Sequence, residues 1–318
     1  MELGILFHFA ILLFGGLIFA KIIHYFHLPD VTGYLIGGLI LGPSVLGLLS
    51  ADAVQGLALV SEIALGFIAF SIGSEFKLEY FKRVGLTPVV IAVFESFLAV
   101  FAVVLGLVLG GQPLPFSLVL GAIAAATAPA ATIMVIKQYR ARGPVTETLL
   151  SVVAIDDATA LIAFGIAVAI AQTLTSTAPV PLLRSILQPV LEIFEALASG
   201  AVLGVLFSLM LRFFKTASNR LSLTIGFVLL CTAVADALSL SALLMTMAMG
   251  AVFTNLCRKS GDILSLCDNI TPPIYMMFFV LSGAGLNLAI LPSMVWWASF
   301  MWCCVWWAKF RAHGWAAR

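Results

Sequence analysis

Apolar stretches of about 20 residues, separated by short polar connections, recur along the whole chain. A helix of that length crosses the hydrocarbon core of a bilayer. The pattern predicts spans at 4–23, 31–49, 57–75, 86–110, 115–137, 147–173, 190–214, 222–237, 240–256 and 269–290, with a candidate eleventh at 294–308. We therefore expect an all-α polytopic membrane protein with about ten spans in the lipid bilayer.

The composition agrees with this pattern. Of 318 residues, 62% are hydrophobic and 10% are charged, which is about half the charged fraction of a soluble domain. The first stretch lacks the basic segment and the cleavage site of a signal peptide, so we expect it to be retained. The five cysteines have no CxxC or disulfide spacing. We expect no cofactor, no metal other than a transported cation, and no nucleic-acid partner.

Basic residues indicate the orientation of the chain in the membrane. With the N-terminus outside, Arg184 is the only basic residue before position 294 that falls on the outer side, which is the bias that the positive-inside rule describes. The following basic residues then lie at cytoplasmic ends or loops: Lys21, Lys77, Lys82, Arg83, Lys137, Arg140, Arg142, Arg212, Lys215, Arg220, Arg258 and Lys259.

A weak internal repeat links two distant spans. The segment 67–73 (FIAFSIG) resembles 278–283 (FFVLSG), and the two predicted helices run in opposite directions. Inverted repeats of this kind are typical of secondary transporters. Similar apolar sequences that contain glycine also arise by chance in packed membrane helices.

Two adjacent carboxylates, Asp156 and Asp157, lie near the middle of the sixth predicted span. One aspartate at that depth costs about 2.5–3.5 kcal/mol on insertion scales, so we expect the pair to have a function. Adjacent helical positions are about 100° apart, so one carboxylate can face a cavity while the other is packed. A buried carboxylate can bind either a proton or a small cation, and that competition is antiport. In the alternative interpretation, both aspartates only hydrogen-bond neighbouring helices.

A proline, Pro129, falls in the middle of the fifth predicted span, between Thr127 and Thr132. Proline removes a helical hydrogen bond, so we expect the helix to break or kink there. The freed carbonyls and the two threonine hydroxyls are candidate cation ligands. A simple proline kink, with the threonines satisfying the backbone, remains the alternative.

Glu62 and Asp236 are possible accessory residues within the third and eighth spans. Each could line the ion path, but each could equally pack or snorkel at a helix end.

The segment 28–44 (LPDVTGYLIGGLILGPS) closely resembles the second helix of bacterial monovalent cation:proton antiporters, within the sodium/hydrogen exchanger superfamily. The Asp156–Asp157 pair resembles the ion-binding helix of the paired-aspartate type. The glycine-rich helix, the proline-interrupted helix and the aspartate pair also occur in the family's order, and the resemblance covers residues 1–293.

The resemblance implies an inverted-repeat antiporter fold with discontinuous helices, built from a dimerisation domain and a moving core, and hence a homodimer. It implies exchange of Na⁺ or K⁺ for H⁺ across the bacterial inner (plasma) membrane, with a role in pH homeostasis. Asp157 matches the carrier, Asp156 its partner, and 127–132 the crossing of unwound segments. Paired-aspartate relatives place a basic residue in the helix equivalent to 269–290, and this chain has none there. Electrogenic and electroneutral exchange therefore both stay open.

The segment 294–318 departs in composition from the rest of the chain. It contains all six tryptophans. If the codons of this segment are read in a frame shifted by one base, they are compatible with an amino-acid sequence that resembles the family. We therefore hypothesise a frameshift near 293–295 that replaces the family's C-terminal core helices. An interfacial aromatic belt is the alternative.

Two further functions compete with active antiport: an inactive, C-terminally truncated antiporter, and an organic-anion:sodium symporter of similar fold. An intramembrane aspartyl protease needs two carboxylates that converge from separate helices. The adjacent aspartates do not fit it, so we do not expect an enzyme.

Overall fold

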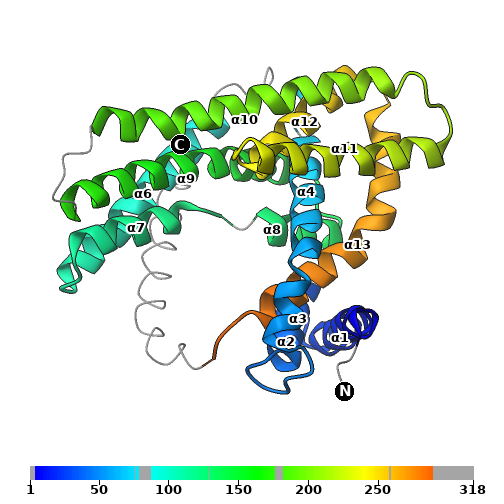
Figure 1. Cartoon of the computed structure of the whole chain (residues 1–318), viewed down its shortest axis with the longest axis horizontal. Helices are drawn as coiled ribbons and strands as arrows, with labels where there is room; N and C mark the ends of the chain where they lie inside the picture. Colours follow the sequence, from blue (N-terminus) through cyan, green and yellow to red (C-terminus); the bar gives the residue numbers. More distant parts are fainter. Residues whose placement is uncertain are drawn as a thin grey trace.

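The computed structural model describes residues 4–74, 76–78, 87–127, 129–175, 182–257 and 259–288. The candidate span at 294–308 and the whole segment 294–318 lie outside these residues. Within them, the secondary structure is helical and contains no strand (Figure 1). The helices are α1 (Ile5–Tyr25), α2 (Asp30–Leu41), α3 (Ala51–Gly56), α4 (Ala58–Ser74), α6 (Thr87–Leu109), α7 (Leu114–Ala125), α8 (Pro129–Tyr139), α9 (Pro144–Thr175), α10 (Leu182–Met210), α11 (Ala217–Ala237), α12 (Ala242–Leu256) and α13 (Ser260–Ala284).

Five of the described helices are long and apolar enough to cross a bilayer: α1, α6, the Leu191–Met210 part of α10, α11 and α13. Shorter apolar helices include α2, α4, α7 and α12. One predicted span proved too long. We expected a helix over 31–49, but α2 ends at Leu41, because Gly42 takes the extended backbone (ψ 178°) favoured before Pro43.

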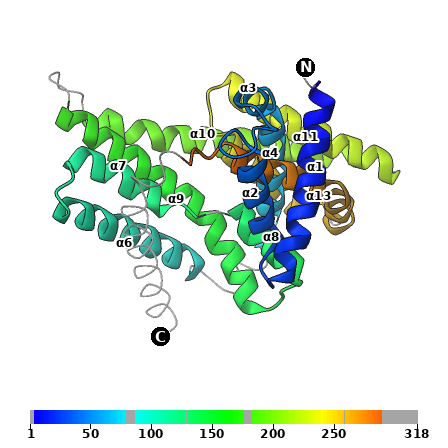
Figure 2. The same ribbon diagram turned by 90° about the horizontal axis from the view of Figure 1, so that it is seen from below.

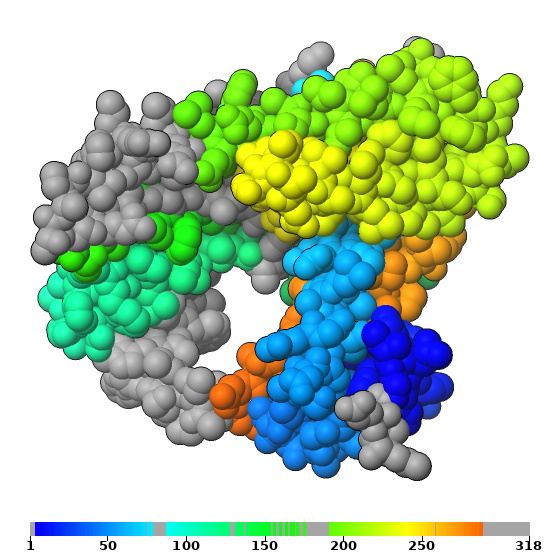
Figure 3. Space-filling model, in the orientation of Figure 1, coloured from blue at the N-terminus to red at the C-terminus, as the bar shows by residue number. Residues whose placement is uncertain are grey.

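The helices pack in two groups (Figures 1 and 2). On one side, α6, α7 and α9 pack on one another. On the other side, α1, α2 and α13 pack together, and α4, α11 and α12 join them. The long helix α10 connects the groups, because it packs against both α9 and α12. Figure 3 shows α10 and α11 along one edge of the molecule, above α4.

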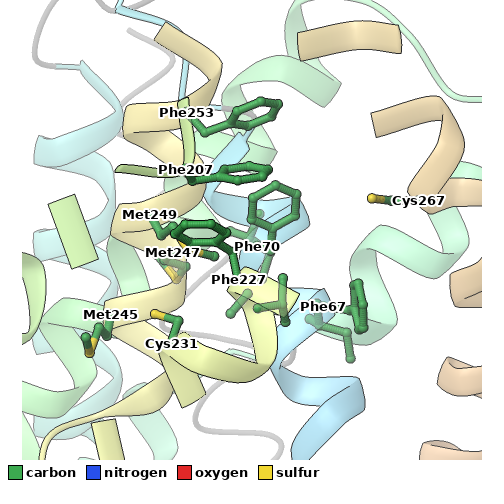
Figure 4. Packing of buried hydrophobic residues seen from close by; sticks show 14 of the residues in the cluster. Phe67, Phe70, Phe207, Phe227, Cys231, Met245, Met247, Met249, Phe253 and Cys267 are labelled. Atoms are coloured by element: carbon green, nitrogen blue, oxygen red, sulfur yellow. The ribbon is translucent and has the colours of Figure 1, made fainter. Parts of the chain in front are cut away.

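Buried aromatic side chains fill the centre of the second group (Figure 4). The ring of Phe253 on α12 lies 5.5 Å from Phe70 on α4 and 4.9 Å from Phe207 on α10, measured between ring centroids. Contacts of this kind stabilise beyond the apolar area that they bury. The cluster therefore fixes α10 against α4 and α12.

Reciprocal glycine contacts join two helix pairs. In the α2–α13 pair, a Cβ on Gly38 would lie 1.9 Å from the carbonyl oxygen of Val280, and one on Gly283 would lie 2.1 Å from that of Leu35. In the α4–α12 pair, a Cβ on Gly73 would lie 2.0 Å from the carbonyl oxygen of Met247. There, Gly250 faces the backbone of α4 in turn. The two helices of the predicted repeat, α4 and α13, thus each pack by glycine against one further helix.

A polar contact ties α8 to the start of α2. The backbone N–H of Asp30 donates to Oε1 of Gln138 at 3.1 Å, and Nε2 of Gln138 donates to Oδ1 of Asp30 at 3.2 Å. Nδ1 of His24, near the end of α1, lies 3.6 Å from the same carboxylate oxygen. Three helix ends therefore meet at one point.

Candidate ion-binding site

The fifth predicted span is broken where the proline predicted it. Helix α7 ends at Ala125, and Ala126 has extended backbone angles (φ −61°, ψ 139°). Thr127 is not helical either, and α8 begins at Pro129. Broken backbone inside a membrane protein is tolerated where protein or a cavity surrounds it, so the break is a candidate place for an ion.

Thr127 lies at this break with its hydroxyl oxygen buried. Among the described residues, Oγ1 of Thr127 has no hydrogen-bond partner. A buried hydroxyl that lacks a partner is costly, and it is also an oxygen that a cation could use. The other predicted threonine ligand, Thr132, is half-buried in the first turns of α8.

Asp156 is packed inside the protein. It is 0% exposed and lies in α9, where that helix packs against α6 and α7. Its Oδ1 accepts a hydrogen bond from the hydroxyl of Ser96 on α6. The carboxyl group is therefore held by a neighbouring helix.

A third residue completes this small network. Oγ1 of Thr159 lies 3.0 Å from the hydroxyl oxygen of Ser96. It also lies 2.9 Å from the backbone carbonyl of Asp156, one turn earlier in α9. Ser96, Asp156 and Thr159 thus form one polar contact across the α6–α9 interface, whose other buried α6 residues are largely apolar.

Sequence reasoning missed two residues here, Glu95 and Ser96. Glu95 is 4% exposed and Ser96 is 1% exposed. Both belong to the buried stripe of α6, which consists of Pro88, Ala92, Glu95, Ser96, Ala99, Val103 and Leu107. The signal was available, because Glu95 is the one charged residue of α6, and a charge inside an apolar span is costly.

The structure describes only part of what was predicted for the other site residues. Asp157 lies in α9 directly after Asp156, and Pro129 begins α8, but both side chains fall outside the described part of the structure. Glu62 on α4 and Asp236 near the end of α11 are exposed. Within the described residues, no hydrogen bond or ion pair joins either of these acids to Asp156. Their place in an ion path therefore remains a prediction.

Comparison with known proteins shows the family of the chain. The family model described as "Sodium/hydrogen exchanger, transmembrane" matches residues 9–312. The chain belongs to the sodium/hydrogen exchanger family. A relative within the curated proteins, the Na⁺/H⁺ antiporter NhaS4 of Synechocystis, is 32% identical over 181 residues. That alignment covers 50% of this chain and 42% of the relative, so the chain spans less than half the length of this relative.

Solved structures share the fold of this exchanger-family chain. The sodium proton antiporter MjNhaP1 of Methanocaldococcus jannaschii at pH 8 superposes with a TM-score of 0.71 at 21% sequence identity. The superposition covers 91% of this chain and 72% of that one. A second structure of MjNhaP1, from an electron-microscopy map, gives a TM-score of 0.73 at 20% identity, with 91% and 71% covered. The predicted antiporter fold with a discontinuous helix is confirmed.

Proposed function

We propose that this protein exchanges a monovalent cation, Na⁺ or K⁺, for protons across the plasma membrane of a bacterial cell. The observation that carries the proposal is a carboxyl pair in the middle of α9, with Asp156 fully buried, in a helix that packs on the broken α7–α8 segment. Membership in the exchanger family supports the same assignment.

The carrier in this proposal is Asp157. Asp156 is already engaged by Ser96, and adjacent helical positions are about 100° apart, so position 157 has a different role. A carboxyl group that loses its proton becomes an oxygen ligand for a cation, and a bound cation prevents reprotonation. Exchange follows from this competition, because the site moves either a proton or a cation. Oxygen atoms of Thr127 and Thr132 would complete the coordination.

Alternating access would come from movement of the α6–α7–α9 group against the helices around α4 and α13. The division of the helix contacts into two groups supports this arrangement. The long helix α10 packs against both groups, and a partly buried polar contact between Asp30 and Gln138 joins α8 to α2. We further propose that the protein works as a homodimer, as the family resemblance implies.

The direct test is cation-driven proton flux in proteoliposomes, followed with a pH-sensitive dye inside the vesicles. We expect Na⁺ or K⁺ gradients to drive proton movement, and Asp157→Asn to abolish it, because an amide cannot release a proton. The control is Glu147→Gln, which removes a carboxylate at the exposed start of the same helix. Flux that persists in Asp157→Asn would contradict the proposal.

A further inference from the structure

A cavity of about 190 Å³ lies where four helix ends meet. Its walls come from the end of α10, the start of α11, the end of α12 and the start of α13. The α10–α11 and α12–α13 connections lie on the same side of the membrane, because two spans, α11 and α12, separate them. The positive-inside pattern assigns that side to the cytoplasm.

Three basic side chains line this cavity: Arg212, Arg220 and Lys259. Nε of Arg220 donates to the backbone carbonyl of Phe214 at 3.0 Å, which fixes the guanidinium group and leaves its terminal nitrogens available. Among the described residues, no ion pair occupies any of the three. One acid lies close in the sequence, Asp262 in the first turn of α13, and it is exposed.

The starts of α11 and α13 add to this positive field. Both helices begin at the cavity, and a helix N-terminus carries a partial positive charge and free backbone N–H groups. Leu211, Leu256 and Ile263 give the wall apolar surface, and Ser208 and Cys257 complete it. Leu256 and the nearby Phe213 are exposed by 55% and 81%. A pocket lined by both basic and apolar side chains and placed at the membrane boundary matches the chemistry of a phospholipid.

We propose that this cavity binds the phosphate headgroup of an anionic phospholipid from the cytoplasmic leaflet. Arg212, Arg220 and Lys259 hold the phosphate oxygens, and the exposed apolar side chains contact the acyl region. Arginine suits this role because its planar guanidinium donates two parallel hydrogen bonds to a phosphate. The bound lipid joins α10 to α11, α12 and α13, so it stabilises the second helix group. The assignment does not depend on antiport.

The experiment compares lipid binding by the purified full chain and by the double variant Arg212→Gln/Lys259→Gln. Arg220 is left intact because it also supports the α10–α11 loop. Thermal unfolding in detergent is measured with added phosphatidylglycerol or, separately, phosphatidylcholine, and bound lipid is counted by native mass spectrometry. At about tenfold excess over the dissociation constant, we expect phosphatidylglycerol to raise the unfolding temperature of the parent by about 2 °C. We expect the variant to lose most of this rise and its phosphatidylglycerol adducts.

The matched control is Lys21→Gln/Arg142→Gln, which removes two exposed basic residues elsewhere on the cytoplasmic side. It should keep the full response to phosphatidylglycerol. An equal response in the two double variants would overturn the proposal, since general attraction to an acidic surface would then explain it. Equal stabilisation by phosphatidylcholine would overturn it as well. A response to millimolar inorganic phosphate as large as the response to lipid would identify a soluble phosphate as the occupant, which also contradicts the assignment.

Discussion

The hydroxyl of Ser96 shows how a buried carboxyl group is held inside a helix bundle. Asp156 has no exposed surface, and a neighbouring helix supplies a hydrogen-bond donor to its Oδ1. A buried polar group with a partner costs far less than one without. The contact also joins α9 to α6 directly before position 157.

Substituting Ser96 with alanine should therefore destabilise the protein by about 1–2 kcal/mol, because Asp156 loses a buried donor. In an Asp156→Ala background the same substitution should cost much less, since the partner is already gone. Thermal unfolding of the parent, the two single variants and the double variant measures the coupling energy between Ser96 and Asp156. The matched control is Ser117→Ala on α7, whose fully buried hydroxyl donates only within its own helix, to the carbonyl of Pro113. Equal costs of Ser96→Ala in the two backgrounds would show that Ser96 does not hold Asp156.

The residues of this site were only partly predictable from the sequence. Asp156 and Asp157 were found because charge in an apolar span is costly and rare. The same rule applies to Glu95, which went unrecognised as a single acid. Which aspartate is packed could not be predicted, because that depends on the neighbour that α6 places beside α9.

Backbone chemistry explains how far the elements could be predicted. Pro129 identified the break between α7 and α8, because proline lacks the N–H that a continuous helix needs. A similar signal, Gly42 before Pro43, marks the end of α2 at Leu41. Our prediction followed the length of the apolar run instead, and therefore extended the helix too far. The pairing of α2 with α13 and of α4 with α12 joins residues far apart in the sequence, so span prediction alone could not give it.

The α2–α13 contact depends on glycine. Gly38→Ala should destabilise the protein by more than about 2 kcal/mol, because its Cβ would overlap the carbonyl oxygen of Val280 and a backbone cannot move away locally. The control is Gly226→Ala in α11, where a Cβ would meet nothing within 4 Å. That change should be neutral or stabilising by up to about 1 kcal/mol. Apparent unfolding temperatures in detergent compare the two, and equal stability of both variants would contradict this packing.

At the scale of the whole molecule, the helices form two groups, and different kinds of residue make the contacts inside each group. The group around α4 is fixed by aromatic packing and by close glycine contacts. The α6–α7–α9 group contains the buried carboxyl groups and is joined to the other mainly by α8 and α10. A tightly packed group beside a group that contains the proposed ion site fits the alternating access that we propose.

The central claim is that a cation and a proton compete for the aspartate pair. The most direct measurement is proton release by the purified protein in weakly buffered detergent solution when NaCl or KCl is added, with choline chloride as the salt control. Our account predicts saturable release by the parent and by Glu147→Gln, and none by Asp157→Asn. Cation binding without proton release, or equal release by Asp157→Asn, would contradict it.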